Sequence, residues 1–211
     1  MALPIVLLAL TVHEVSHGFI AYKLGDPTAK NLGRLTLNPI KHLDPMGTIC
    51  MILFHFGWAK PVPINTRYFK KPRRDTALTA LAGPVSNLLL ALVGVLLYHI
   101  LLTIFVNVPA GSSFVYNIFD ATLMFMSTFV YYNVALAIFN LIPAPPLDGS
   151  RIFLTFLPAK YYFGLMKYER YIQLALILLL CLNVLNGPLS WAVSKVVGGM
   201  EFIIDLIPFL A

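Results

Sequence analysis

Three residues in the first apolar stretch could hold and use a metal ion. His13, Glu14 and His17 form the pattern HEVSH within residues 2–22, which are otherwise almost wholly apolar. On a helix, residues four apart share a face, so both imidazoles can reach one Zn²⁺. Glu14 follows the first histidine directly and can take a proton from a water molecule at that ion. The pattern therefore predicts a zinc hydrolase centre within the lipid.

The apolar surroundings decide between this interpretation and a chance match. HExxH is a short pattern, and on solvated helices it occurs without any metal because its polar side chains face water. Inside a membrane span, an ionised side chain costs on the order of 2.5 kcal/mol unless it is paired, solvated or bound to metal. A carboxylate and two histidines within residues 2–22 therefore favour a metal site over a solvated face.

Asp148 is the best-placed carboxylate for a third ligand. It lies in Asn140–Gly149, NLIPAPPLDG, whose three prolines forbid a regular helix. The apolar stretch before it returns to the side where residues 2–22 end, which brings Asp148 to the depth of the two histidines. Irregular backbone at that depth is tolerated only where it lines protein or a watery cavity. Two histidines and a carboxylate, with a fourth position left to water, are typical of catalytic zinc sites.

Composition indicates a polytopic membrane protein. Hydrophobic residues make up 59% of the chain, charged residues 11%, and the mean hydropathy is +0.81, which does not fit a water-facing surface around one soluble core. We expect an all-α fold of about five to six transmembrane segments. These would form a single domain, 1–211, with its core in 2–22, 77–106 and 114–151. The apolar stretches are 2–22, 46–58, 77–106, 114–142, 171–186 and 189–211. The last of them either crosses the bilayer or lies on its surface as an amphipathic helix.

The second apolar stretch is too short to span a bilayer. As a helix, residues 46–58 would reach about 20 Å, against a hydrocarbon core of about 30 Å. We expect a re-entrant segment near 46–64 that enters the membrane and turns back, built as a helix or as a β-hairpin. An exposed hairpin edge over 49–64 could pair with an unwound substrate, which would make Ile52 and Phe54 substrate-binding residues.

The basic residues predict the orientation in the membrane. With a re-entrant second stretch, fourteen of the fifteen Lys and Arg residues fall on one side of the bilayer. The positive-inside rule makes that side cytoplasmic. The net charge of +6 then reflects topology and attraction to anionic lipid headgroups. No module that combines aromatic and basic residues accompanies it, so we expect no nucleic-acid partner.

Together these motifs resemble the site-2 protease family of intramembrane zinc metalloproteases. Between HEVSH and the downstream NLIPAPPLDG lies Gly83–Asn87, which resembles the GPxxN motif of that family. Leu35–Pro39 and Gly57–Pro63 resemble its small bacterial and archaeal branch, which has no PDZ domain. The resemblance covers residues 12–151, which is most of the chain.

The resemblance implies that His13, His17 and Asp148 bind one Zn²⁺ per chain and that Glu14 is the catalytic base. It also implies a peptidase that cleaves single-span membrane proteins within or near their transmembrane segments, in regulated intramembrane proteolysis. We expect a multi-pass protein of a prokaryotic cell membrane, with the active site toward the cytoplasmic side. Neither the residues nor the resemblance predicts an oligomeric state.

The main alternative is a divalent-metal transporter or a metal-binding membrane protein without hydrolytic activity. Such a protein could place His13, His17 and Asp148 along a metal pathway. Glu14, directly after the first ligand, and the single-site arrangement favour hydrolysis.

Asn87, Asn133 and Asn140 are among the asparagines in apolar stretches, where this residue more often packs than takes part in catalysis. Asn140 matches a family motif position, and we interpret it either as a catalytic donor to the substrate carbonyl or oxyanion, or as a residue that bonds the helix end. Asn87 also matches a motif position and is a candidate for substrate binding. Alternatively, it could satisfy the carbonyl that Pro84 frees. Asn133 matches no motif, so we expect it to pack.

Four other polar residues have ordinary expected roles. Asp26 and Asp44 each precede a proline, where turn or helix-cap hydrogen bonds are the usual function. His42 and His99 have no partner at ligand spacing, so a structural role is expected for both.

Overall fold

The protein is all helical over the residues that the computed structural model describes, which are 2–54, 59–106, 113–156, 164 and 167–207. The only pairing of extended backbone in this part is one antiparallel bridge between Leu43 and Ala59. The helices are α1 (Ala2–Lys23), α2 (Thr28–Asn31), α3 (Pro45–Phe54), α4 (Pro72–Val106), α5 (Ser113–Asn140), α6 (Asp148–Leu154), α8 (Glu169–Cys181) and α9 (Asn186–Asp205), with the 3₁₀ turns η1 (Pro39–His42) and η2 (Thr66–Tyr68). The all-α prediction is confirmed.

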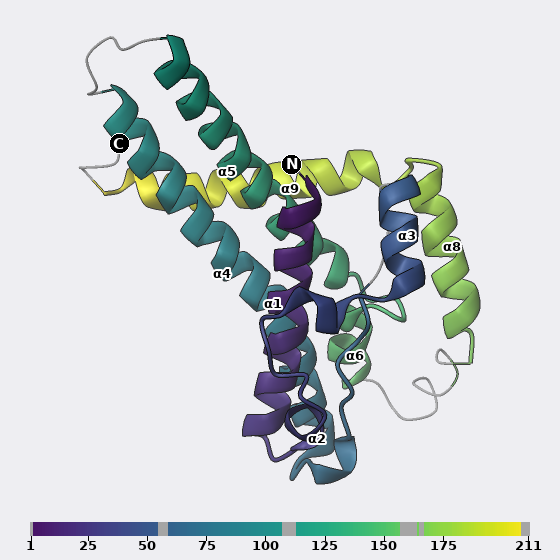
Figure 1. Cartoon of the computed structure of the whole chain (residues 1–211). Coiled ribbons are helices and arrows are strands. Elements are labelled where there is room, and N and C mark those ends of the chain that lie inside the picture. Colours follow the sequence, from purple (N-terminus) through teal and green to yellow (C-terminus); the bar gives the residue numbers. More distant parts are fainter. Residues whose placement is uncertain (1, 55–58, 107–112, 157–163, 165–166, 208–211) are drawn as a thin grey trace.

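Three helices are long and apolar enough to cross a membrane. They are Leu3–Lys23 of α1, Pro72–Val106 of α4 and Phe114–Asn140 of α5. Figure 1 shows α1 lying against α4 and α5, with which it packs. Helices α8 and α9 pass the same test only as a pair bent by 84°. The described residues thus hold three candidate spans, or four if the pair counts as one, and the predicted five to six is not confirmed.

Helices α4, α5 and α9 enclose the main apolar core. Its buried members are Ala91, Val95, Val130, Val134, Val193 and Ile204. Gly94 of α4 allows close approach, because a Cβ atom there would lie 2.9 Å from Phe129 Cδ1 and 2.9 Å from Val130 Cγ2. Small residues at such contacts are how membrane helices gain van der Waals packing.

Two helices end next to a residue whose backbone has a positive φ. Gly25, with φ 110°, follows α1, and the amide of Asp26 donates to Ala21 O at 2.9 Å. Asn183, with φ 58°, follows α8, and the amide of Val184 donates to Leu179 O at 3.1 Å. Both ends have the hydrogen bonds of a Schellman motif, which satisfies carbonyls that the helix leaves free. The second one produces the bend between α8 and α9.

Helix α9 crosses α4 and α5 instead of running along them, as Figure 1 shows. The two predicted apolar stretches at 171–186 and 189–211 correspond to α8 and α9 over their described parts. The sequence left open whether the last stretch crosses the bilayer or lies on its surface. The sharp bend after α8 means that α9 cannot continue the direction of α8 through the membrane.

The segment after the first loop is a helix in its described part, which corrects the β-hairpin alternative for 45–54. Asp44 caps α3, because Gly47 N donates to its Oδ1 at 2.8 Å and Thr48 N to its carbonyl at 2.8 Å. Pro45 occupies the first helical position, where its missing N–H costs nothing. This start signal favours a helix over a strand, and it confirms the cap role expected for Asp44. Residues 55–58, where the segment would turn back, lie outside the described residues.

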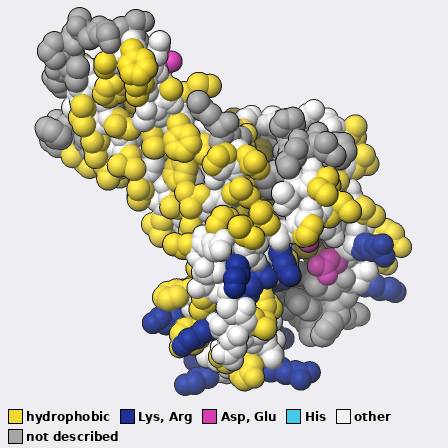
Figure 2. Space-filling view, in the orientation of Figure 1, with side chains coloured by type: hydrophobic (Ala, Val, Ile, Leu, Met, Phe, Trp, Pro, Cys, Tyr) yellow, Lys and Arg dark blue, Asp and Glu magenta, His cyan; other side chains and the backbone are white. Residues whose placement is uncertain are grey.

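Lysine and arginine gather at one end of the molecule. Figure 2 shows them at the lower end, where α2 and the neighbouring ends of α1 and α4 lie in Figure 1, with a mostly hydrophobic surface above. Lys23 ends α1, and Arg73 and Arg74 lie in the first turn of α4. The surface is thus divided into an apolar part and a cationic end, as expected for a protein embedded in a bilayer.

Candidate metal centre

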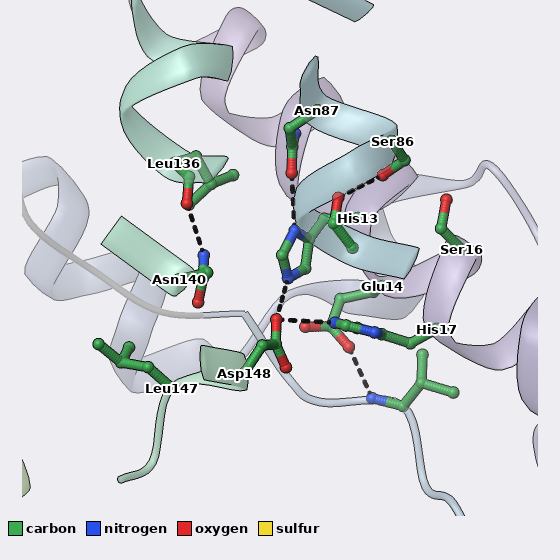
Figure 3. A network of polar contacts seen from close by, with 12 residues as sticks. His13, Glu14, Ser16, His17, Ser86, Asn87, Leu136, Asn140, Leu147 and Asp148 are labelled. Atoms are coloured by element: carbon green, nitrogen blue, oxygen red, sulfur yellow. Dashed lines mark hydrogen bonds and ion pairs between the residues drawn. The ribbon is translucent and has the colours of Figure 1, made fainter. Parts of the chain in front are cut away.

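His13 and His17 of α1 meet Asp148 of α6 at one point inside the protein (Figure 3). Asp148 Oδ2 lies 3.0 Å from His13 Nε2 and 3.1 Å from His17 Nε2. The three ligand atoms all lie within 4.8 Å of one another, and the residues are only 4%, 6% and 9% exposed. The structure therefore brings together the three residues that the sequence selected as metal ligands.

The second nitrogen of each imidazole is fixed by an acceptor. His17 Nδ1 donates to the backbone carbonyl of Thr79 at 2.7 Å, and His13 Nδ1 donates to Asn87 Oδ1 at 2.7 Å. A carbonyl oxygen cannot donate, so both Nδ1 atoms carry a proton, and in the neutral imidazole that metal binding needs each Nε2 atom then presents a lone pair. Two lone pairs and a carboxylate oxygen thus converge on the same point. Three acceptors in contact repel one another unless a cation lies between them.

Zinc fits this set of donors. Imidazole nitrogen and carboxylate oxygen are ordinary zinc ligands, and tetrahedral coordination at bond lengths near 2.1 Å places ligand atoms about 3.4 Å apart. The two distances to Asp148 Oδ2, 3.0 and 3.1 Å, differ from that value by a few tenths of an ångström. Three protein ligands also leave one coordination position open.

The loop between α5 and α6 brings Asp148 to the histidines. The prolines after Asn140 end α5, and Asp148 is the first residue of α6, after Leu147 in an extended conformation. Gly149 must be small, because a Cβ atom there would overlap the carbonyl oxygens of Leu141 and Ile142.

Gly83 of α4 forms one wall of the centre. A Cβ atom at this position would lie 2.5 Å from His13 Cε1 and 2.5 Å from His17 Nε2. The glycine of the GPxxN motif therefore lets α4 approach both imidazoles. The same helix supplies Thr79 and Asn87, which hold the Nδ1 atoms, so α4 positions both histidines from one side.

Asn87 belongs to a buried chain of hydrogen bonds that ends on His13. Its Nδ2 donates to Ala9 O at 3.1 Å and to Asn133 Oδ1 at 3.1 Å, and Asn133 Nδ2 donates to Phe129 O at 2.9 Å. Both asparagines are 0% exposed. The carbonyl expected to be freed near Pro84 does not engage Asn87. Within this motif Ser86 Oγ donates to Gly83 O at 2.7 Å.

Glu14 and Asn140 face a cavity of about 210 Å³ beside the metal ligands. Its walls come from α1, α5, α8, Ala59 and the loop before α6, and most of the lining residues are apolar. The polar lining side chains among the described residues are His13, Glu14, Asn140 and Gln173. Asn140 Nδ2 donates to Leu136 O at 2.9 Å, one turn earlier in α5 (Figure 3). An amide, a carboxylate and a metal site thus share one apolar chamber.

Residues 1–183 match the family model described as "Peptidase family M50". The chain belongs to this family, the site-2 proteases. Membership supports a membrane-embedded metallopeptidase, as the sequence motifs predicted. The matched range of this chain contains His13, Glu14, His17 and Asp148, together with Asn87 and Asn140.

Curated M50 relatives extend over most of this chain. "Putative zinc metalloprotease YwhC" of Bacillus subtilis is 44% identical over 165 residues, which are 78% of this chain and 73% of the relative. "Putative zinc metalloprotease Rip2" of Mycolicibacterium smegmatis is 34% identical over 149 residues, 68% of this chain and 52% of the relative. The M. tuberculosis H37Rv protein of the same name is 27% identical over 188 residues, 86% of this chain and 66% of the relative. The M50 chain thus spans about half to three quarters of these proteins. No solved structure matches it.

For Ile52 and Phe54 the structure describes the backbone and not the side chains, so it does not test their expected role in the M50 site. Both belong to α3, whose backbone is helical, so the extended edge that was expected to pair with substrate is absent over 49–54. The side chains of 51–54 lie outside the described part of the structure. Their role in substrate binding stays a prediction.

Sequence reasoning missed three groups of this M50 site. Asn133 was expected only to pack, but it bonds Asn87. Gln173 is the only amide side chain in 171–182, and that polar residue in an apolar stretch was a signal for the cavity wall. The Val62 backbone amide donates to Glu14 Oε2 at 2.8 Å, and no side-chain pattern could have indicated it.

Proposed function

We propose that this M50 protein is an intramembrane zinc endopeptidase in which His13, His17 and Asp148 hold one Zn²⁺ per chain. The convergence of two imidazole nitrogens and a carboxylate oxygen within 4.8 Å carries the proposal, because a divalent cation stabilises three such ligand atoms in contact. The open fourth position and the adjoining cavity favour a catalytic ion over a structural one.

Glu14 acts as the general base and acid. The bound zinc would polarise the scissile carbonyl and make a water molecule beside it more acidic. The Glu14 carboxylate lines the cavity next to His13, within reach of a water there, and takes its proton. The hydroxide left by this transfer adds to the scissile carbonyl carbon, and the protonated Glu14 carboxyl passes its proton to the amine nitrogen as the C–N bond breaks.

Asn140 binds the oxygen of the reacting carbonyl. One hydrogen of its Nδ2 is used by Leu136 O, and the second, which has no acceptor among the described residues, can donate into the cavity that Asn140 lines. A fixed donor aimed at developing negative charge lowers the barrier most when water is excluded. The apolar walls of the cavity favour that exclusion.

The substrates are single-span membrane proteins, cleaved within or near their transmembrane segment in regulated intramembrane proteolysis. An apolar chamber bordered by α1, α5 and α8 suits an apolar peptide. A substrate helix must unwind first, because its own hydrogen bonds shield the peptide bond. The cationic end of the molecule (Figure 2) would face the cytoplasm of a prokaryotic cell, and His13 and His17 lie in the half of α1 that ends there at Lys23.

Cleavage by purified protein tests the proposal. Wild-type protein is incubated in detergent micelles with a tagged single-span substrate, and zinc is measured in the same preparations. Glu14→Gln should keep zinc and lose cleavage, Asp148→Ala should lose both, and Glu201→Gln, the same chemical change at an exposed position of α9, should keep both. A wild-type protein that holds zinc, cuts no substrate and moves divalent metal into vesicles would instead be a transporter.

A further inference from the structure

An extended segment passes directly beside the proposed catalytic base. Between Ala59 and Asn65 the chain forms no helix, and the Val62 N–H donates to Glu14 Oε2 at 2.8 Å. Val62 itself is 6% exposed. The Glu14 carboxylate therefore has one oxygen fixed by main chain from a distant part of the sequence, while the residue lines the cavity.

Buried side chains hold this segment on both sides of Val62. Arg34 Nη2 donates to Lys60 O at 2.7 Å, and Lys60 N donates to His42 O at 2.8 Å. On the other side, Asn65 N donates to Asp26 Oδ2 at 2.6 Å. Arg34 is 9% exposed and Asp26 0% exposed. Anchors on both sides leave the Val62 amide little freedom to move.

The sequence makes Val62 the only possible backbone donor in its immediate surroundings. It lies between Pro61 and Pro63, and neither proline has an N–H. Prolines also restrict the backbone to extended conformations, so the direction of the Val62 N–H is set before Glu14 meets it. One rigid donor thus faces one carboxylate oxygen.

We infer that the Val62 backbone amide is a positioning group that holds Glu14 for proton transfer. Glutamate has three rotatable side-chain bonds, and its freedom has to be removed before it can act on a water at a fixed place. A hydrogen bond on Oε2 fixes the carboxylate and leaves Oε1 to the cavity. This inference rests on the proposed function, because it assigns Glu14 as the base.

Backbone variants at Val62 test the inference. Val62→Pro removes the N–H in a segment that is already proline-rich, and replacement of Val62 by its α-hydroxy acid changes only the N–H to an ester oxygen. Ile64→Pro is the matched control, because the Ile64 N–H has no hydrogen-bond partner among the described residues. All are purified with the wild type, and kcat, KM and zinc content are measured with the tagged single-span substrate.

We expect both Val62 variants to lose about 10- to 100-fold in kcat, the range for one hydrogen bond to a charged group, with KM and zinc content unchanged. Ile64→Pro should keep the wild-type kcat. Wild-type kcat in the hydroxy-acid variant would overturn the inference, and so would a parallel loss of zinc, which indicates a structural role. Failure of the wild-type protein to cleave would refute the proposed function itself, a result distinct from either of these.

Discussion

His13 Nδ1 lies 2.7 Å from Asn87 Oδ1, and this bond joins the first ligand of α1 to a fully buried amide of α4. The orientation of the Asn87 amide is fixed in turn, because its Nδ2 donates to Ala9 O and to Asn133 Oδ1. The His13 ring can therefore present only Nε2 to the metal. Partners that orient ligands in this way typically contribute 10- to 100-fold to metal affinity.

Asn87→Ala should weaken zinc binding by about 10- to 100-fold, because the His13 ring loses its orienting acceptor. Asn133→Ala should have a smaller effect in the same direction, since Asn133 acts only through Asn87. Competition with a zinc chelator measures both affinities. Ser86→Ala, one residue away on α4, is the control and should bind zinc like the wild type. Equal affinities in Asn87→Ala and the control would contradict the orienting role.

The ligands of the centre could be predicted because each carries a local signal. His13 and His17 share a helix face by spacing alone, and Asp148 follows prolines that end the preceding helix. The Asn87–Asn133 bond carries no such signal. It depends on how α4 docks against α5, and a buried amide without a motif looks the same as a packing residue.

The segment at 45–54 shows where the sequence was ambiguous in physical terms. A short apolar run has no period that separates a buried strand from a buried helix. The deciding signal was local, since Asp44 and Pro45 form a cap and a first helical turn. The sequence predicts a turn or cap at Asp44, but for the segment that follows it allows both a helix and a β-hairpin.

Gly83→Ala should reduce zinc affinity by at least about 10-fold, because the new methyl group would lie 2.5 Å from atoms of both imidazoles and would displace them. Zinc content after dialysis against a chelator measures the effect. Gly198→Ala on α9 is a matched control, since a Cβ atom there meets nothing within 4 Å and alanine favours a helix. Normal zinc content in Gly83→Ala would show that α4 does not need this close approach.

Removal of zinc should lower the thermal stability of the wild-type protein, because three acceptors would then be left without a cation. Ligand that binds only the folded state at about 1,000 times its Kd stabilises it by about 4 kcal/mol. The midpoint of thermal unfolding, measured in detergent with and without chelator, should fall in the wild type and recover when zinc is restored. Asp148→Ala should have a low midpoint that chelator does not change. A chelator effect of the same size in Asp148→Ala would assign the stabilising ion to another site.

Labelling of single cysteines should place the cationic end in the cytoplasm. With Cys50 and Cys181 replaced by serine, Lys30→Cys should react with a membrane-impermeant maleimide only after the cells are opened. Phe114 lies in the first turn of α5, and its side chain is 72% exposed in the wild type. Phe114→Cys should react in intact cells. The positive-inside rule gives this direction. The reverse labelling pattern would place the metal centre nearer the outer face.

Asn140→Ala should lower kcat about 100-fold without loss of zinc, because one oxyanion donor contributes about that much in other hydrolases. Asn140→Asp should fall as far, since a carboxylate cannot donate to the reacting oxygen. Asn186→Ala, an exposed amide at the start of α9, is the control for loss of an asparagine. Steady-state cleavage kinetics and midpoints of thermal unfolding separate the two roles of Asn140, as a donor to the reacting oxygen and as a residue that bonds the helix end. A lower midpoint with unchanged kcat would mean that the bond from Asn140 to Leu136 O serves only to close the end of α5.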